Sequence, residues 1–191
     1  MLSADIMGAS WIAFIVYWII SSIGTKKDSS RTGSAWLSVG ARLVIAAAVI
    51  AALKVPFLRN LVRVSFDKLS MGHPAIRAVG AVLCIVGVGL AIWARTILGR
   101  NWSGRPSTKE GHELVTGGPY SVVRHPIYTG MLTAMLGTFF IAGLPGLLVF
   151  IAFSGVVIYR INVEERLMVQ LFADKYLEYR RRTKALIPFL V

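Results

Sequence analysis

The chain has 191 residues, of which 55% are hydrophobic, and its mean hydropathy of +0.66 excludes an ordinary soluble domain. One small membrane bundle is the predicted class. The formal net charge of +12 does not indicate nucleic-acid binding, because the basic residues flank apolar segments and do not line one face with interleaved aromatics. The single cysteine, Cys84, allows no disulfide within the chain, and no Cys/His spacing predicts a metal site.

Uncharged segments predict an all-α integral membrane protein with five transmembrane helices. The first three spans are residues 6–23, 35–53 and 78–94. A fourth uncharged run, residues 127–159, would be about 50 Å long as one helix, too long to cross a hydrocarbon core of about 30 Å once. Because Gly-Leu-Pro-Gly interrupts it at 143–146, this run is predicted to form a tight hairpin of two short spans.

The remaining segments complete the predicted organisation. Residues 1–98 form an N-terminal region of three spans, in which residues 56–69 are expected to be an interfacial amphipathic helix. Residues 99–191 form the core, made of a cytosolic loop (99–124), the hairpin and a C-terminal cytosolic helix (162–182). With the N-terminus outside and the C-terminus cytosolic, fifteen basic residues lie on the cytosolic side and five on the other, as the positive-inside rule favours.

A group of polar side chains stands just before the long apolar run. Tyr120, Arg124, His125 and Tyr128 fall within nine positions, and Pro126 predicts that a helix begins directly after His125. The free N–H groups of such a helix start can bind a carboxylate. The alternative is an interfacial belt of Arg and Tyr that only anchors the bundle.

Two further segments are candidates for ligand binding. His112, Glu113, Leu114 and Val115 precede a Gly-Gly-Pro turn, whose glycines would let the backbone approach a ligand closely; the alternative is a flexible connector.

The second segment lies beyond the hairpin, where Arg160 and Glu164 are four residues apart and share one helix face with Glu165 adjacent. Two neighbouring carboxylates at the inner end of a membrane helix indicate a site for a cationic ligand, with Arg160 holding an anionic one. The alternative is a solvated salt bridge at the membrane edge.

These motifs resemble one family. The run HELVTGGPYSVVRHPIYTG at 112–130, then R-x-x-x-E-E at 160–165, then FADKYLEYRRR at 172–182 is similar to the isoprenylcysteine carboxyl methyltransferases and, more distantly, to the phospholipid methyltransferases. The resemblance covers the chain from His112 onward in the right order and spacing.

The resemblance implies S-adenosylmethionine as methyl donor and S-adenosylhomocysteine as product. It implies catalytic roles for Arg124, near the reacting groups, and for Arg160, which would hold the substrate. The cofactor contacts it implies, with Glu165 joining Glu164 as the adjacent carboxylate, are His112, Glu113, Leu114, Val115, Tyr120, His125, Pro126, Ile127, Tyr128, Glu164 and Glu165.

The expected reaction is methyl transfer to a lipophilic carboxylate that enters from the bilayer, at the boundary between membrane and cytosol. An in-line displacement at a sulfonium needs alignment of the two reactants and no metal. The residues leave other readings open: methylation of a lipid amine or of a small hydrophobic thiol, an NADPH-dependent membrane reductase, or a membrane protein without catalytic activity. The acidic pair at 164–165 favours a sulfonium over the phosphates of a dinucleotide.

Overall fold

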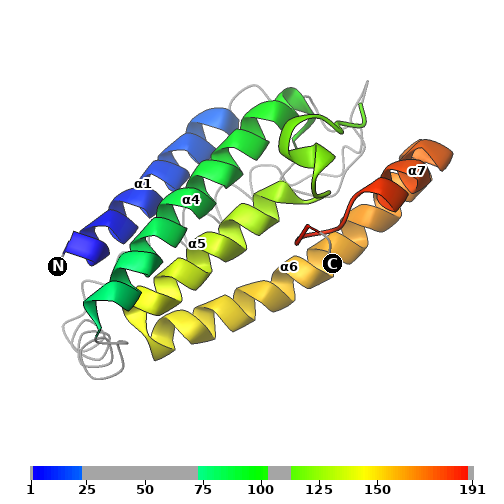
Figure 1. Cartoon of the computed structure of the whole chain (residues 1–191). Coiled ribbons are helices and arrows are strands. Elements are labelled where there is room, and N and C mark those ends of the chain that lie inside the picture. Colours follow the sequence, from blue (N-terminus) through cyan, green and yellow to red (C-terminus); the bar gives the residue numbers. More distant parts are fainter. Residues whose placement is uncertain (1, 23–72, 103–112, 189–191) are drawn as a thin grey trace, which may run out of the picture.

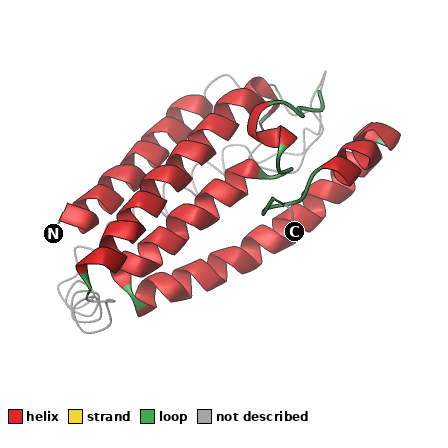
Figure 2. Ribbon diagram, viewed as in Figure 1, coloured by secondary structure: helices red, strands yellow, loops and turns green. Residues whose placement is uncertain are grey.

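The computed structural model describes residues 2–22, 73–102 and 113–188. Within these ranges the chain is helical apart from connecting segments and one isolated parallel bridge, which confirms the predicted all-α class (Figure 2). The helices are α1 (Leu2–Ser22), α4 (Pro74–Leu98), α5 (Pro126–Ala142), α6 (Leu144–Phe172) and α7 (Asp174–Arg182), with short 3-10 helices η1 (Gly99–Asn101) and η2 (Gly118–Ser121). The predicted span at 35–53, the predicted interfacial helix at 56–69 and His112 lie outside the described residues.

In the part of the chain that the structure describes, α1, α4 and α6 are each long and apolar enough to cross a membrane, while α5, with 17 residues, is shorter. Large apolar side chains point outward from these helices: Ile12 is 64% exposed, Val82 58% and Leu148 61%. An outward apolar surface on the spanning helices is what a lipid environment requires, so the protein is a multi-pass integral membrane protein.

Proline and glycine set the helix boundaries. His73 caps α4 by accepting the Ala75 N–H on its Nδ1 at 3.3 Å, directly before Pro74. Pro126 begins α5. Gly143, with φ of 68°, ends α5 and immediately precedes α6, so the break predicted at 143–146 falls at its first residue.

One predicted boundary is wrong. The sequence predicted a short second arm of the hairpin followed by a separate helix over 162–182, but α6 runs without interruption for 29 residues to Phe172. The stripe from Arg160 through Glu164, Met168 and Phe172 continues the helical period, and no breaker lies within it. The chain turns only at Ala173, which has a φ of 43°, and α7 follows.

Figure 1 shows α1, α4 and α5 lying side by side, while α6 leaves α5 at the turn and runs along one side of the bundle. The contact between α4 and α5 is close because glycines of one helix face the backbone of the other. A Cβ added to Gly87 would lie 2.4 Å from Ala134 N, and one added to Gly137 would lie 2.4 Å from Gly80 O. Small residues at such contacts are typical of helix packing in membranes.

Candidate active site

One cavity of about 520 Å³ lies where the ends of α1 and α4 meet η2, the start of α5 and the middle of α6. Most of the predicted site residues line it: Glu113, Leu114, Val115, Tyr120, Arg124, His125, Ile127, Tyr128, Arg160 and Glu164. Residues from three separate segments of the sequence are therefore brought to one chamber. Two predicted cofactor contacts are not among the lining residues: Pro126, which is fully buried, and Glu165.

Glu164 is the centre of the polar wall. Its Oε1 accepts a hydrogen bond from Tyr128 Oη at 2.6 Å and one from Arg160 Nη2 at 3.2 Å. Its Oε2 is 3.8 Å from His125 Nδ1. Because side chains from α5 and α6 converge on this carboxylate, its oxygens are held in place at the cavity surface before any ligand arrives.

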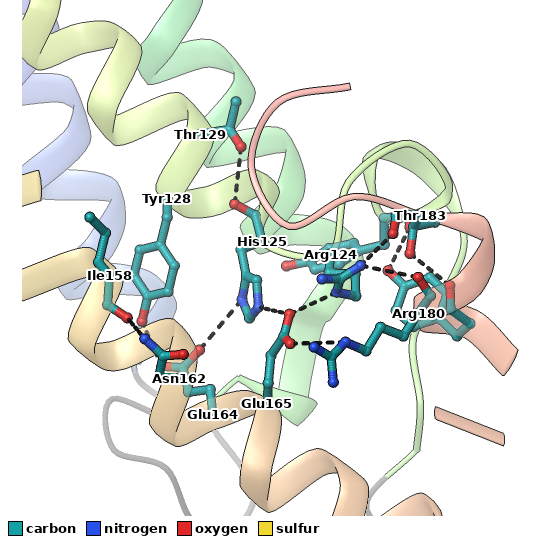
Figure 3. A network of polar contacts seen from close by, with 12 residues as sticks. Arg124, His125, Tyr128, Thr129, Ile158, Asn162, Glu164, Glu165, Arg180 and Thr183 are labelled. Carbon is teal, nitrogen blue, oxygen red and sulfur yellow. Dashed lines mark hydrogen bonds and ion pairs between the residues drawn. The ribbon is translucent and has the colours of Figure 1, made fainter. Parts of the chain in front are cut away.

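Glu165 points to a different set of partners (Figure 3). Its Oε1 accepts from Arg124 Nε at 2.7 Å and lies 3.4 Å from His125 Nε2, and its Oε2 is 3.5 Å from Arg180 Nε. The side chain is only 12% exposed. Glu165 therefore joins α6 to α7 and to the segment before α5. It was predicted as a cofactor contact, but its side chain is not among the residues that line the cavity.

The ring of His125 stands between the two carboxylates, with one nitrogen toward each. Its ring also stacks on Tyr128, with centroids 5.9 Å apart. The side chain is thereby fixed on both sides, which gives the cavity wall a defined shape.

Buried tyrosines form another part of the wall. Tyr179 on α7 donates its hydroxyl to the carbonyl of Tyr120 at 2.6 Å. Burial raises the pKa of Tyr179 to about 12, against the opposing influence of Arg124, and burial also raises the pKa of Tyr120 and of Tyr176. All three therefore stay neutral hydrogen-bonding groups across the physiological pH range.

The rest of the lining is apolar and was missed by sequence reasoning. It consists of Phe14, Trp18, Leu98, Trp102, Met131, Phe153, Val156, Val157, Leu167 and Met168, together with the polar Asn101. Tyr176 and Tyr179, which lie in the predicted C-terminal helix over 162–182, line it as well. The predicted N-terminal region thus contributes walls of the cavity through α1 and the end of α4. Trp18 lies in the predicted first span, residues 6–23, and nothing in its sequence context indicates the cavity.

A buried arginine fixes this apolar wall. Arg95 is 3% exposed and donates to Ser21 O at 2.5 Å and to Gly99 O at 2.8 Å, which joins the ends of α1 and α4. Its guanidinium lies 4.6 Å from the centre of the Trp102 ring, and Trp102 in turn packs edge-on against Trp18 at 5.8 Å. Cation–π contacts of this kind strengthen when they are removed from water.

The cavity therefore has one charged wall, carrying carboxylates and guanidinium groups, and one apolar wall, within a bundle of membrane helices. Such a chamber fits an amphipathic ligand beside a charged, polar one. The residues present fit S-adenosylmethionine, because Glu113 and Glu164 can face its positive groups, while Arg160 can face the carboxylate of a second ligand. Among the residues that the structure describes, no group of His, Cys, Asp and Glu is arranged to hold a metal ion. The fold and the cavity define a membrane-embedded helical bundle with an internal ligand chamber.

Comparison with known proteins identifies the family. The sequence model described as phospholipid methyltransferase matches residues 75–175. The chain is 29% identical over 195 residues to the protein-S-isoprenylcysteine O-methyltransferase of Schizosaccharomyces pombe, covering 95% of this chain and 72% of that protein. It is 31% identical over 145 residues to protein-S-isoprenylcysteine O-methyltransferase B of Arabidopsis thaliana, covering 73% of each.

A solved structure is also similar. It is the eukaryotic intramembrane Ras methyltransferase, an isoprenylcysteine carboxyl methyltransferase, with a TM-score of 0.56 and 25% identity over 76% of this chain. The present chain spans about half of that one, 52%. The chain belongs to the family of membrane methyltransferases that includes the phospholipid methyltransferases and the protein-S-isoprenylcysteine O-methyltransferases. The resemblance seen in the motifs is confirmed, and the matched region extends further toward the N-terminus than those motifs.

Proposed function

We propose that this methyltransferase transfers the methyl group of S-adenosylmethionine to the carboxylate of an isoprenylcysteine-like or other lipophilic acceptor. The observation that carries the proposal is the shared cavity, in which Glu164, Tyr128 and Arg160 face an apolar wall. The names of the relatives support an isoprenylcysteine acceptor. The excess of basic residues on the predicted cytosolic side supports a cavity reached by the cofactor from the cytosol and by the acceptor from the lipid.

When bound, S-adenosylmethionine supplies an activated methyl group on a sulfonium. The chain's own residues bind and orient the reactants. Glu164, held by Tyr128 and Arg160, presents a carboxylate to positive charge on the cofactor, and residues 113–115 line the same space. Electrostatic contacts that are already in place hold their geometry during the reaction without reorganising.

Arg160 orients the acceptor. Its side chain is 33% exposed at the cavity, and the planar guanidinium matches a carboxylate through parallel hydrogen bonds. A carboxylate is already ionised at pH 7, so no general base has to remove a proton. Alignment alone can lower such a barrier by roughly 7–11 kcal/mol.

Arg160 also favours a carboxylate acceptor over a lipid amine. A lipid amine is cationic at neutral pH, would be repelled by Arg160 and would have to lose a proton before it could react. Methyl transfer to a farnesylcysteine analogue, compared with transfer to phosphatidylethanolamine in the same detergent, tests this choice. Turnover of the amine lipid alone would overturn the carboxylate acceptor and leave the methyltransferase assignment in place.

Calorimetry in detergent tests the cofactor. We expect S-adenosylhomocysteine to bind and NADPH to give no heat; the reverse result would favour a reductase. Glu164→Ala should weaken S-adenosylhomocysteine binding more than tenfold, because it removes the carboxylate at the centre of the polar wall. Arg160→Ala should leave that affinity within about threefold while abolishing turnover. Arg166→Ala, an exposed arginine on the same helix, is the matched control. Equal loss of affinity in the Glu164 and Arg160 variants would contradict these separate roles.

A further inference from the structure

The segment that follows α7 returns to the start of α5 and packs against the residues just before that helix, among them the cavity-lining Arg124 and His125. Residues 183–188, here called the C-terminal strap, pair with the segment before Pro126 through a parallel bridge between Val123 and Lys184. The Arg124 N–H donates to Lys184 O at 2.8 Å, and the His125 N–H donates to Ala185 O at 3.0 Å. Thr183 is 5% exposed, so the strap begins in the protein interior.

Side chains reinforce the same contact. Arg124 Nη1 donates to the carbonyls of Thr183 and, at 3.3 Å, of Arg180, while its Nε donates to Glu165. One turn into α5, Thr129 Oγ1 donates to Leu186 O at 2.7 Å. Carbonyls of residues 180 and 183–186 thus accept hydrogen bonds from backbone and side-chain donors of the motif.

These bonds matter because Arg124 and His125 lie outside any helix. The N–H groups at and just before the start of a helix have no hydrogen-bond acceptor within that helix. A backbone donor left unpaired away from water is costly. The strap provides the partners for Arg124 and His125. It thereby sets the backbone at His125, whose ring stands on the cavity wall between Glu164 and Glu165.

We infer that the C-terminal strap is a positioning element for the cofactor-binding wall, and that Arg124 is a positioning residue that links the strap to His125. The strap residues do not line the cavity, so they act through the Arg124–His125 backbone. This assigns Arg124 a role different from the predicted one beside the reacting groups. The effect on cofactor affinity rests on the proposed function, whereas the effect on the backbone of His125 does not.

Thr129→Val tests the inference with a near-isosteric change outside the cavity. It removes the donor to Leu186 O and an intrahelical bond to His125 O. Thr133→Val is the matched control, because within the described part of the chain Thr133 Oγ1 bonds inside α5, to Thr129 O at 2.8 Å. We expect Thr129→Val to weaken S-adenosylhomocysteine binding roughly three- to tenfold, Thr133→Val to leave it unchanged, and Thr129→Ser to restore it.

Amide hydrogen exchange, followed by mass spectrometry on peptides containing residues 122–128 without cofactor, gives a readout independent of the reaction. In Thr129→Val we expect exchange at Arg124 and His125 to be roughly tenfold faster than in the unaltered protein. In Thr133→Val we expect the exchange rate to stay unchanged. Equal exchange in the two variants would contradict the claim that the strap holds the backbone of Arg124 and His125. Faster exchange in Thr129→Val with unchanged S-adenosylhomocysteine affinity would contradict the strap's positioning role. If the unaltered protein bound no S-adenosylhomocysteine, the proposed function would fail and the exchange data would still decide the strap's hold on His125.

Discussion

Two regions of the molecule, the glycine contact between α4 and α5 and the cavity end, are held together by different forces. Where α4 crosses α5, Gly80, Gly87, Gly130 and Gly137 bring the two backbones close, because a Cβ added at any of them would meet backbone atoms of the other helix. At the cavity end, ion pairs and hydrogen bonds to backbone carbonyls join α5, α6 and α7. In a membrane the first kind of contact depends on shape alone, since lipid and apolar side chains are equally apolar. The second depends on keeping every buried charge paired.

This contrast predicts how each end fails. A side chain added at the glycine contact meets main-chain atoms that cannot move out of the way, so the helices must separate. A charge removed at the cavity end leaves a partner without its counter-ion while the helices remain packed. The fold should therefore be sensitive to shape at the glycine contact, and to the pairing of buried charges at the cavity end.

Gly87→Val should have the largest effect. Its Cβ would lie 2.4 Å from Ala134 N and 2.5 Å from Gly130 O, so α4 and α5 could not approach, at a cost of more than about 3 kcal/mol. The recovery of monodisperse protein from detergent, measured by size-exclusion chromatography, should fall to background. Gly89→Val on the same helix is the control, because no atom of the described residues lies within 4 Å of a Cβ there. Equal recovery of the two variants would contradict the claim that close backbone contact at Gly87 is needed for α4 and α5 to pack.

Glu165→Gln should have the next largest effect. The change leaves Arg124 and Arg180 without their shared carboxylate in a site where Glu165 is 12% exposed, which should cost about 3 kcal/mol and lower the melting temperature in detergent by roughly 6–12 °C.

Glu178→Gln provides the comparison for this loss. Its partner is Arg182, and the two side chains are 63% and 74% exposed, so the change should cost less than about 0.5 kcal/mol. Similar melting temperatures for the two variants would show that burial does not decide the strength of these ion pairs. The claim that buried, paired charges stabilise the cavity end would then be wrong.

Much of the local structure could be predicted, because it follows from neighbours in sequence. Pro126 and Gly143 mark helix boundaries through their own backbone restrictions, and the spacing of Arg160 and Glu164 places them on one helix face regardless of what surrounds them. The polar cluster at 120–128 was recognisable because ionisable groups beside an apolar run need partners.

Other features depend on tertiary contacts that no local pattern encodes. Phe14 and Trp18 look like any apolar face of a membrane helix, and only the fold brings them to the cavity. Glu164 and Glu165 are adjacent and chemically alike, so sequence alone could not tell that one faces the cavity and the other faces Arg124. The backbone acceptors of the strap are invisible in a sequence, because every residue carries a carbonyl.

Tyr179→Phe should have a smaller effect than Gly87→Val or Glu165→Gln. It removes one hydrogen bond to Tyr120 O, worth about 1 kcal/mol, and should lower the melting temperature by roughly 2–4 °C. Burial raises the pKa of Tyr179 to about 12, above the value of about 10 expected in the unfolded chain. The hydroxyl's contribution is therefore complete below pH 10 and is lost only as the pH rises toward 12, so the difference between variant and parent should be constant from pH 6 to pH 9. A difference that shrinks within that range would show that the hydroxyl ionises more easily than its burial implies, and that this part of the cavity end is open to water.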